Sequence, residues 1–281
     1  MDEEAHQLLL PLVEEENICL PLPINVVSKY WNVELPMAEA IESAKKYSDF
    51  DGSIIIEGIE IAERHGLSCK IVHSSLPELK KIIDSGIPPI VILPGIPEIT
   101  QHASVITGYD EDEKTILHYI QKGNQEGEQQ EGAIPQDIFD REWSEEGRLL
   151  IIISPSDILS KITLENNFQN ESNRLCFNSE QLNILKNSTE ALLSLKKSIE
   201  LDSNNSTALH LYGTMLNQQN SPECVSFYEK SLKINARSYL TFNGLGNFYL
   251  KTNQFEKAEN YYSKAIEINP KRSAKIYKNR A

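Results

Sequence analysis

Two residues with side chains suited to covalent chemistry, Cys19 and His102, lie 83 positions apart. Cys19 lies two residues before Pro21 and four before Pro23. Proline is tolerated in the first turn of a helix but not in its interior. We therefore expect a helix to begin near residue 20, with the thiol at the positive end of the helix dipole, where a thiolate is favoured. His102 opens the alternating stretch HASVITGYD, a predicted strand. A thiol with a histidine base is the pairing of a cysteine nucleophile, whereas a lone cysteine is more commonly a small buried hydrophobe.

The first half of the chain, which must position this pair, is predicted to contain both helices and strands. Helical spacing of apolar residues, with serine or glycine at the ends, predicts helices over 23–31, 37–47, 56–66 and 75–86. Short apolar or alternating runs predict strands over 68–74, 88–95, 102–110, 114–120 and 148–155. The polar, glycine-rich tract 122–132 predicts a mobile loop. Helices come first and strands follow, which favours an α+β fold.

The segment from Glu16 to Pro155 resembles a peptidase C39-like domain, the papain-fold family of the bacteriocin-leader peptidases. The resemblance follows four landmarks in order: ICLPLPINVVSKYW, then IEGIEIAERHGLSCKIVHSSLPELKKIIDSGIPPIVIL, then HASVITGYDED, then IPQDIFDREWSEEGRLLIIISP. It implies a papain-like α+β domain in which Cys19 is the catalytic nucleophile and His102 the catalytic base.

Two supports of the family's chemistry are replaced in this chain. Val13 stands where the family has its oxyanion glutamine, and losing one such donor typically costs about 10²–10³ in rate. Leu20 replaces the glycine after the cysteine. His118 and Tyr119 occupy the places of the triad aspartate, so these two are the candidates for catalytic support. Three interpretations stay open: a working thiol peptidase, a pseudo-peptidase whose cleft binds a peptide without cutting it, and two residues that are relics in a core.

The second half of the chain repeats itself with a period of 34 residues. Tyr228 and Tyr262 are 34 apart, as are Ser231 and Ala265, and small residues recur where helices would cross. This resembles the tetratricopeptide repeat. Its last full copy carries the family's pattern at Phe242, Leu245, Gly246, Tyr249, Ala258, Tyr262, Ala265 and Pro270. A degenerate copy covers roughly 172–205, and another stops at Ala281, so the last repeat is incomplete.

Repeat solenoids bind partners on a concave face lined by the first helix of each pair. By position in the repeat, His210, Thr214, Asn243 and Asn247 are expected to line that face and to bind a peptide. Basic residues are missing at the matching positions, so no carboxylate clamp is predicted. The alternative is that these polar residues are merely solvated. The aromatic set Phe242, Tyr249, Tyr261 and Tyr262 is interpreted as core packing.

Composition limits the classes of function. Residues 1–155 carry 29 Asp and Glu against 11 Lys and Arg, a charge of −18, and residues 156–281 carry 12 against 16, a charge of +4. Such an acidic body argues against a nucleic-acid partner. No apolar run approaches the length of a membrane span, and the acidic N-terminus is unlike a secretory signal, so we predict no membrane partner and a cytoplasmic location.

The four cysteines and six histidines have no metal-ligand spacing, so we predict neither a metal nor any other cofactor. The expected organisation is a C39-like domain over 1–155, a linker over 156–171 and tetratricopeptide repeats over 172–281. The sequence gives no oligomeric state. It favours a peptide- or protein-binding protein, with an active Cys-His thiol peptidase and a scaffold that binds through its repeats only as the alternatives.

Overall fold

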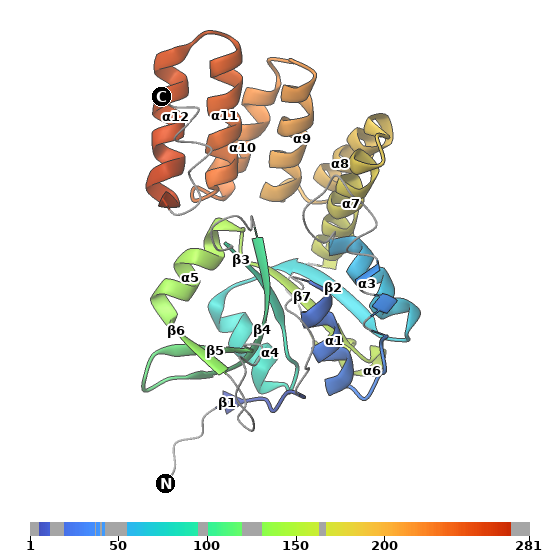
Figure 1. The fold of residues 1–281 in the computed structure, drawn as a ribbon. Coiled ribbons are helices and arrows are strands. Elements are labelled where there is room, and N and C mark those ends of the chain that lie inside the picture. The colour runs from blue at the N-terminus through green and yellow to red at the C-terminus, as the bar shows by residue number, and fades with distance from the viewer. Residues whose placement is uncertain are drawn as a thin grey trace. The chain divides into compact units, whose positions relative to one another are not determined.

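The computed structural model describes residues 6–11, 20–36, 38–39, 41–42, 55–94, 101–119, 131–162 and 167–270. Contacts divide the chain into two compact units (Figure 1). The first contains the described residues up to Leu93, together with His102–Trp143 and Arg148 to residue 162. The second contains the helical region from Asn167 onward and the short segments 94–101 and 144–147.

The first unit is built on a seven-stranded sheet in which the strand order is β2-β7-β3-β4-β5-β6, with β1 pairing to β4. The strands are β1 His6–Gln7, β2 Ser68–His73, β3 Ile90–Pro94, β4 Gln101–Asp110, β5 Thr115–Tyr119, β6 Glu131–Pro135 and β7 Leu149–Ser154. All six residues of β7 are buried because this strand is flanked by β2 and β3. Its sequence LLIIIS accordingly lacks the alternation of a half-exposed strand.

Helices lie against this sheet and bury its apolar side chains. They are α1 Pro21–Tyr30, α3 Ile55–Arg64, α4 Leu76–Asp84, α5 Gln136–Glu145 and α6 Ser156–Leu159. One core joins α4 and α5 to the even-numbered side chains of β7, with Leu79 and Trp143 fully buried. Helices α1 and α3 pack on each other at Gly58, where any larger residue would collide with Ile24.

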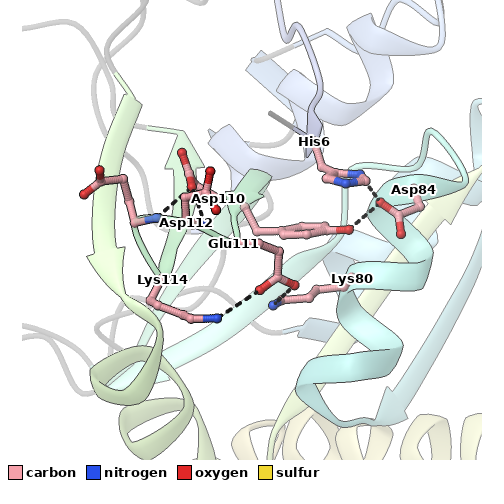
Figure 2. A network of polar contacts seen from close by, with 9 residues as sticks. His6, Lys80, Asp84, Asp110, Glu111, Asp112 and Lys114 are labelled. Carbon is pink, nitrogen blue, oxygen red and sulfur yellow. Dashed lines mark hydrogen bonds and ion pairs between the residues drawn. The ribbon is translucent and has the colours of Figure 1, made fainter. Parts of the chain in front are cut away.

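The short strand β1 is attached to β4 by backbone pairing and by a network of side chains (Figure 2). The His6 ring stacks on Tyr109 with centroids 4.5 Å apart, and its Nδ1 lies 2.7 Å from Oδ1 of Asp84. Tyr109 donates its hydroxyl to the same carboxylate at 2.8 Å, and burial together with that bond raises the pKa of Tyr109 to about 12. Lys80 donates to Glu111 at 2.7 Å. Gly108 is required beside β1, because any side chain there would collide with the His6 carbonyl oxygen.

The second unit consists of helices arranged as successive antiparallel pairs (Figure 1). The pairs are α7 Asn167–Ile184 with α8 Ser188–Leu201, α9 Ser206–Gln218 with α10 Cys224–Ile234, and α11 Tyr239–Lys251 with α12 Phe255–Ile268. Two of these helices, α9 and α11, are capped by a residue type expected at a helix start. Asn205 accepts a hydrogen bond from the Ala208 amide at 2.9 Å, and Ser238 accepts one from the Thr241 amide at 3.4 Å.

In each of the two later pairs, a glycine on the first helix contacts a tyrosine on the second helix, which lets the two helices pack closely. A Cβ at Gly213 would lie 3.0 Å from the Tyr228 ring, and at Gly246 it would overlap the Tyr262 ring. Both tyrosines are fully buried, and so is Ala258 on α12. The predicted close approach at Gly246 and Ala258 is therefore confirmed.

Only one of the four aromatic residues predicted as core packing is fully buried. Tyr262 is buried, whereas Phe242, Tyr249 and Tyr261 are half-buried. These three rings form a ladder in which Tyr249 stacks on Tyr261 at 5.4 Å and Phe242 on Tyr261 at 6.4 Å. Lys264 lies over both Tyr261 and Phe242, because its ammonium is attracted to the ring faces.

The structure bears out the predicted fold class of an α+β N-terminal domain followed by all-α repeats. In the first unit, the described helices and strands form where the pattern predicts them, with four additions, β1, β6, α5 and α6. Glu131 and Gly132 were assigned to the mobile loop and instead begin β6, because they pair with Tyr119 and His118 of β5. The rest of that loop, and most of the helix expected over 37–47, lie outside the described residues.

The domain boundaries 1–155, 156–171 and 172–281 stay a prediction; α6 and the first turns of α7 fall within the range given to the linker. Of the helices that the structure describes, none combines the length and apolar character needed to cross a bilayer.

Candidate functional sites

The helix expected to follow Cys19 begins at Pro21, with Leu20 as the residue before its first turn. Cys19 itself and Val13 lie outside the described residues. Leu20 is buried, and its side chain lies against Gly58 of α3. The bulky residue that follows Cys19 is therefore packed between α1 and α3.

His102 lies at the beginning of β4 and is half-buried. Burial lowers the pKa of its imidazole, because a charged ring would lose its hydration. The ring is consequently neutral at physiological pH, which is the protonation state that a general base needs.

His118 lies on the same face of the sheet as His102. Side chains alternate along a strand, so His102 and Ser104 point to one face of β4. His118 pairs in register with Ile106 and its Nδ1 lies 3.2 Å from the Ser104 Oγ, which places it on that face. Burial lowers the pKa of His118, and a charge on His102 lowers it further.

Tyr119, the other candidate for support, follows His118 directly and points to the opposite face by the same alternation. Asp110, the first carboxylate after His102 in the sequence, is engaged in a turn. Asp110 accepts hydrogen bonds from the amides of Asp112 and Glu113 at 2.8 and 2.9 Å, which makes it the turn residue that its sequence position predicts.

The repeats contain a cavity of about 440 Å³ between α9 and α11, closed below by Tyr228 of α10; we call it the α9–α11 groove. The residues predicted for peptide binding, His210, Asn243 and Asn247, all line it, as does Thr214. The sequence analysis did not predict the other lining residues as part of a binding face; these are Asn217, Gln218, Tyr228, Leu240, Gly244, Leu250 and Lys251. Leu250 and Lys251 follow Asn247 by one turn of α11, as Asn247 follows Asn243, so continuing the helical period would have found them.

Several groove residues are held by hydrogen bonds to the repeat core. The His210 Nδ1 lies 3.0 Å from the Thr241 Oγ1, and burial lowers the pKa of His210 to about 4. Tyr262 donates its hydroxyl to Asn247 Oδ1 at 2.8 Å, and Tyr228 donates to Thr214 at 3.2 Å. These hydrogen bonds fix the positions of several polar side chains in the groove.

The groove carries little charge. Lys251 is the cation among its described lining residues, and none of these is an Asp or Glu. Its Nζ donates to the backbone oxygen of Asn217 at 3.3 Å and reaches the side-chain oxygen at 3.5 Å. Since His210 is neutral at physiological pH, one ammonium accounts for the charge of the described lining.

The described cysteines, Cys69, Cys176 and Cys224, form no disulfide with one another and are buried. Burial raises the pKa of the Cys176 thiol well above its usual range and also raises that of Cys224. Both thiols are therefore protonated and unreactive at neutral pH. Within the described ranges, no group of three or more His, Cys, Asp or Glu is placed to hold a metal ion.

Comparison with known proteins identifies a tetratricopeptide repeat at residues 239–272. The chain is similar to anaphase-promoting complex subunit 3 of Schizosaccharomyces pombe, with 31% identity over 125 residues, covering 43% of this chain. The match spans 18% of the length of that relative.

Three solved structures resemble parts of the chain. A double glycine motif protease from an AMS/PCAT transporter, in complex with the leader peptide, is 20% identical with a TM-score of 0.41 and covers 53% of this chain and 94% of its own. The first tetratricopeptide domain of Spaghetti (RPAP3), bound to the HSP90 peptide SRMEEVD, is 13% identical with a TM-score of 0.38, covering 42% and 95%. The N-terminal domain of stress-induced protein-1 from C. elegans is 20% identical with a TM-score of 0.36, covering 41% and 94%.

Proposed function

We propose that this chain is a peptide- or protein-binding protein in which the repeats hold the partner and the N-terminal domain is a degenerate C39-like cysteine peptidase. The observation that carries the proposal is that His210, Asn243 and Asn247, chosen by repeat position alone, line one groove of about 440 Å³. A solvated surface would not require that its polar residues be anchored by buried tyrosines, as Asn247 and Thr214 are. We further propose that the protein acts in the cytoplasm.

In the N-terminal domain, the proposed papain-like cleft keeps Cys19 and His102 and lacks the family's oxyanion glutamine and triad aspartate. His118 is the better candidate for the missing orienting residue than Tyr119, because it shares the face of His102 and hydrogen-bonds to Ser104. An imidazole supplies no negative charge, so it would stabilise a protonated His102 less than a carboxylate does. This favours a cleft that binds over one that cuts.

The second candidate function is an active thiol peptidase that uses a Cys19-His102 dyad. It is favoured by one observation, the half-buried and neutral imidazole of His102 at the start of β4. In that mechanism His102 takes the proton of the Cys19 thiol, the thiolate attacks the peptide carbonyl, and the same proton passes to the leaving amine.

Labelling with iodoacetamide across pH, read by mass spectrometry at each cysteine, separates the two functions. For the binding protein, we expect Cys19 to react with the pH dependence of an ordinary thiol and to be indifferent to His102→Ala. An activated dyad would label rapidly below pH 7 and would lose that reactivity in His102→Ala but not in the control His65→Ala. Buried Cys176 and Cys224 provide the internal slow references.

A further inference from the structure

The hydrogen bond between Ser104 on β4 and His118 on β5 lies on the face of the sheet that carries His102. The Ser104 Oγ is 3.2 Å from the His118 Nδ1, and only 3% of the surface of Ser104 is exposed. Among the described residues, neither the Ser104 hydroxyl nor the His118 ring forms another hydrogen bond. The position of the hydrogen on the imidazole therefore depends on which of the two atoms donates in this one bond.

The count of donors and acceptors favours the serine as the donor. A hydroxyl carries one hydrogen, and within the described part of the chain the His118 Nδ1 is the acceptor that it reaches. If His118 donated instead, the buried hydroxyl hydrogen would be left without an acceptor, which costs free energy. Burial lowers the pKa of His118, so the ring is neutral at physiological pH and carries a single hydrogen. That hydrogen then lies on Nε2.

We infer that Ser104 is a positioning residue that holds His118 as its Nε2–H tautomer, so that His118 presents a hydrogen-bond donor at the place where the peptidase family has an accepting carboxylate. The inference rests on the proposed function of the N-terminal domain as a degenerate peptidase, and it names what keeps His102 from acting as a base. A carboxylate accepts the N–H of the catalytic histidine and leaves the opposite ring nitrogen free to take a proton from the nucleophile. A donor has the reverse effect.

The tautomer of His118 has a consequence for His102. The two rings influence each other electrostatically, since a charge on His102 lowers the pKa of His118. A hydrogen bond donated by His118 would be accepted by one nitrogen of His102, whose own hydrogen would then lie on the other ring nitrogen, where a base must be unprotonated. In serine peptidases, a histidine held in the wrong tautomer lowers the rate by about 10⁴. One donor in this place is therefore enough to leave a site that binds without cutting.

Nitrogen NMR of the full chain reads the tautomer directly. At about pH 8, above the ordinary histidine pKa of ~6.5, long-range proton–nitrogen spectra distinguish a ring nitrogen that carries a hydrogen from one that does not. We expect the His118 signals, identified by their loss in His118→Asn, to show the hydrogen on Nε2. Ser104→Ala should give a mixture of both tautomers, and Ser104→Thr, which keeps the hydroxyl, should restore the single state. The matched control is Ser154→Ala, which removes a buried hydroxyl of β7 that donates to the Pro155 carbonyl and should leave the signals unchanged.

The reactivity of Cys19 reads the consequence. His118→Asp replaces the donor by an accepting carboxylate, which would also stabilise a protonated His102 and with it the Cys19 thiolate. We expect iodoacetamide to label Cys19 about tenfold faster at about pH 6 in this variant than in the unaltered chain, and the gain should vanish when His102→Ala is added. The matched control is His118→Asn, which has the size of aspartate without its charge and should leave the labelling slow.

The outcomes are distinct. Three results would each overturn this inference and leave the proposed binding function intact: a hydrogen on Nδ1 of His118 in the unaltered chain, an unchanged tautomer in Ser104→Ala, or labelling of Cys19 that is no faster in His118→Asp than in His118→Asn. Rapid labelling of Cys19 in the unaltered chain that depends on His102 would instead overturn the proposed function of a degenerate peptidase, on which the inference rests.

Discussion

The α9–α11 groove and the histidine-bearing face of β4 and β5 both place half-buried imidazoles next to polar partners, but they are built differently. His210 is anchored to Thr241 within a groove whose other residues recur at fixed positions of successive repeats. His102 depends on neighbours that come from a different strand, His118 being positioned by the register between β4 and β5. The repeat period therefore places the groove residues, whereas the sheet face depends on the register between two strands.

This difference also decides which changes should damage each region. The groove residues rest on the repeat core, so a core substitution should alter binding at a distance. On the sheet, His118 contacts Ser104 and responds to the charge of His102, so substitutions there should have local and smaller effects.

The largest effect is expected for Tyr262→Ala, which removes a fully buried ring and the donor to Asn247. We expect the free energy of unfolding to fall by about 3–5 kcal/mol, as for other buried aromatic truncations. Urea denaturation of the full chain would measure it. Tyr262→Phe keeps the ring and removes only the hydrogen bond, so its loss should be about 1 kcal/mol. If the free energy of unfolding fell no more in Tyr262→Ala than in Tyr262→Phe, the buried ring of Tyr262 would not be part of the core that supports the groove.

The same contrast explains how much was predictable from the sequence. The period of 34 residues predicted that His210, Asn243 and Asn247 share one face, and they line one groove. The sheet was predicted strand by strand, but its order was not, because strand pairing depends on distant contacts. His118 and Tyr119 therefore stood as equal candidates until the register separated them. That Asn243 Oδ1 is buried without a hydrogen-bond partner among the described residues could not be foreseen, since it depends on which neighbouring groups reach it.

A second prediction concerns pH and sharpens the description of His210. Its pKa is about 4 in the folded chain because of burial, while in the unfolded chain it is ~6.5. Between these two pH values the unfolded chain binds more protons than the folded chain. Protonation therefore favours the unfolded chain, and the free energy of unfolding falls as the pH drops from 6.5 to 4. The expected loss is of order 2–3 kcal/mol relative to His210→Asn, which cannot titrate.

Comparing the two proteins also removes the opposing effect of Glu180. Burial raises the pKa of that carboxyl to about 7, so its contribution to stability grows as pH falls. Both proteins carry Glu180, and its contribution cancels in the difference between their unfolding curves. A difference that stays constant from pH 7 to pH 4 would mean that His210 titrates like a solvated residue.

The smallest effect is expected on the sheet, where His102 and His118 should sense each other's charge. Burial is the main cause of the lowered pKa of His118, and the charge of His102 adds to it. In His102→Ala the pKa of His118 should therefore rise slightly and stay below the ordinary value, because the burial remains. Nuclear magnetic resonance titration of the imidazole signals measures this, with His65→Asn as the control at another site. An unchanged His118 titration in His102→Ala would separate the two residues and remove His118 as the orienting partner of the proposed base. A clear rise would keep His118 in that role and show that the sheet face, unlike the groove, works through a single pair of side chains.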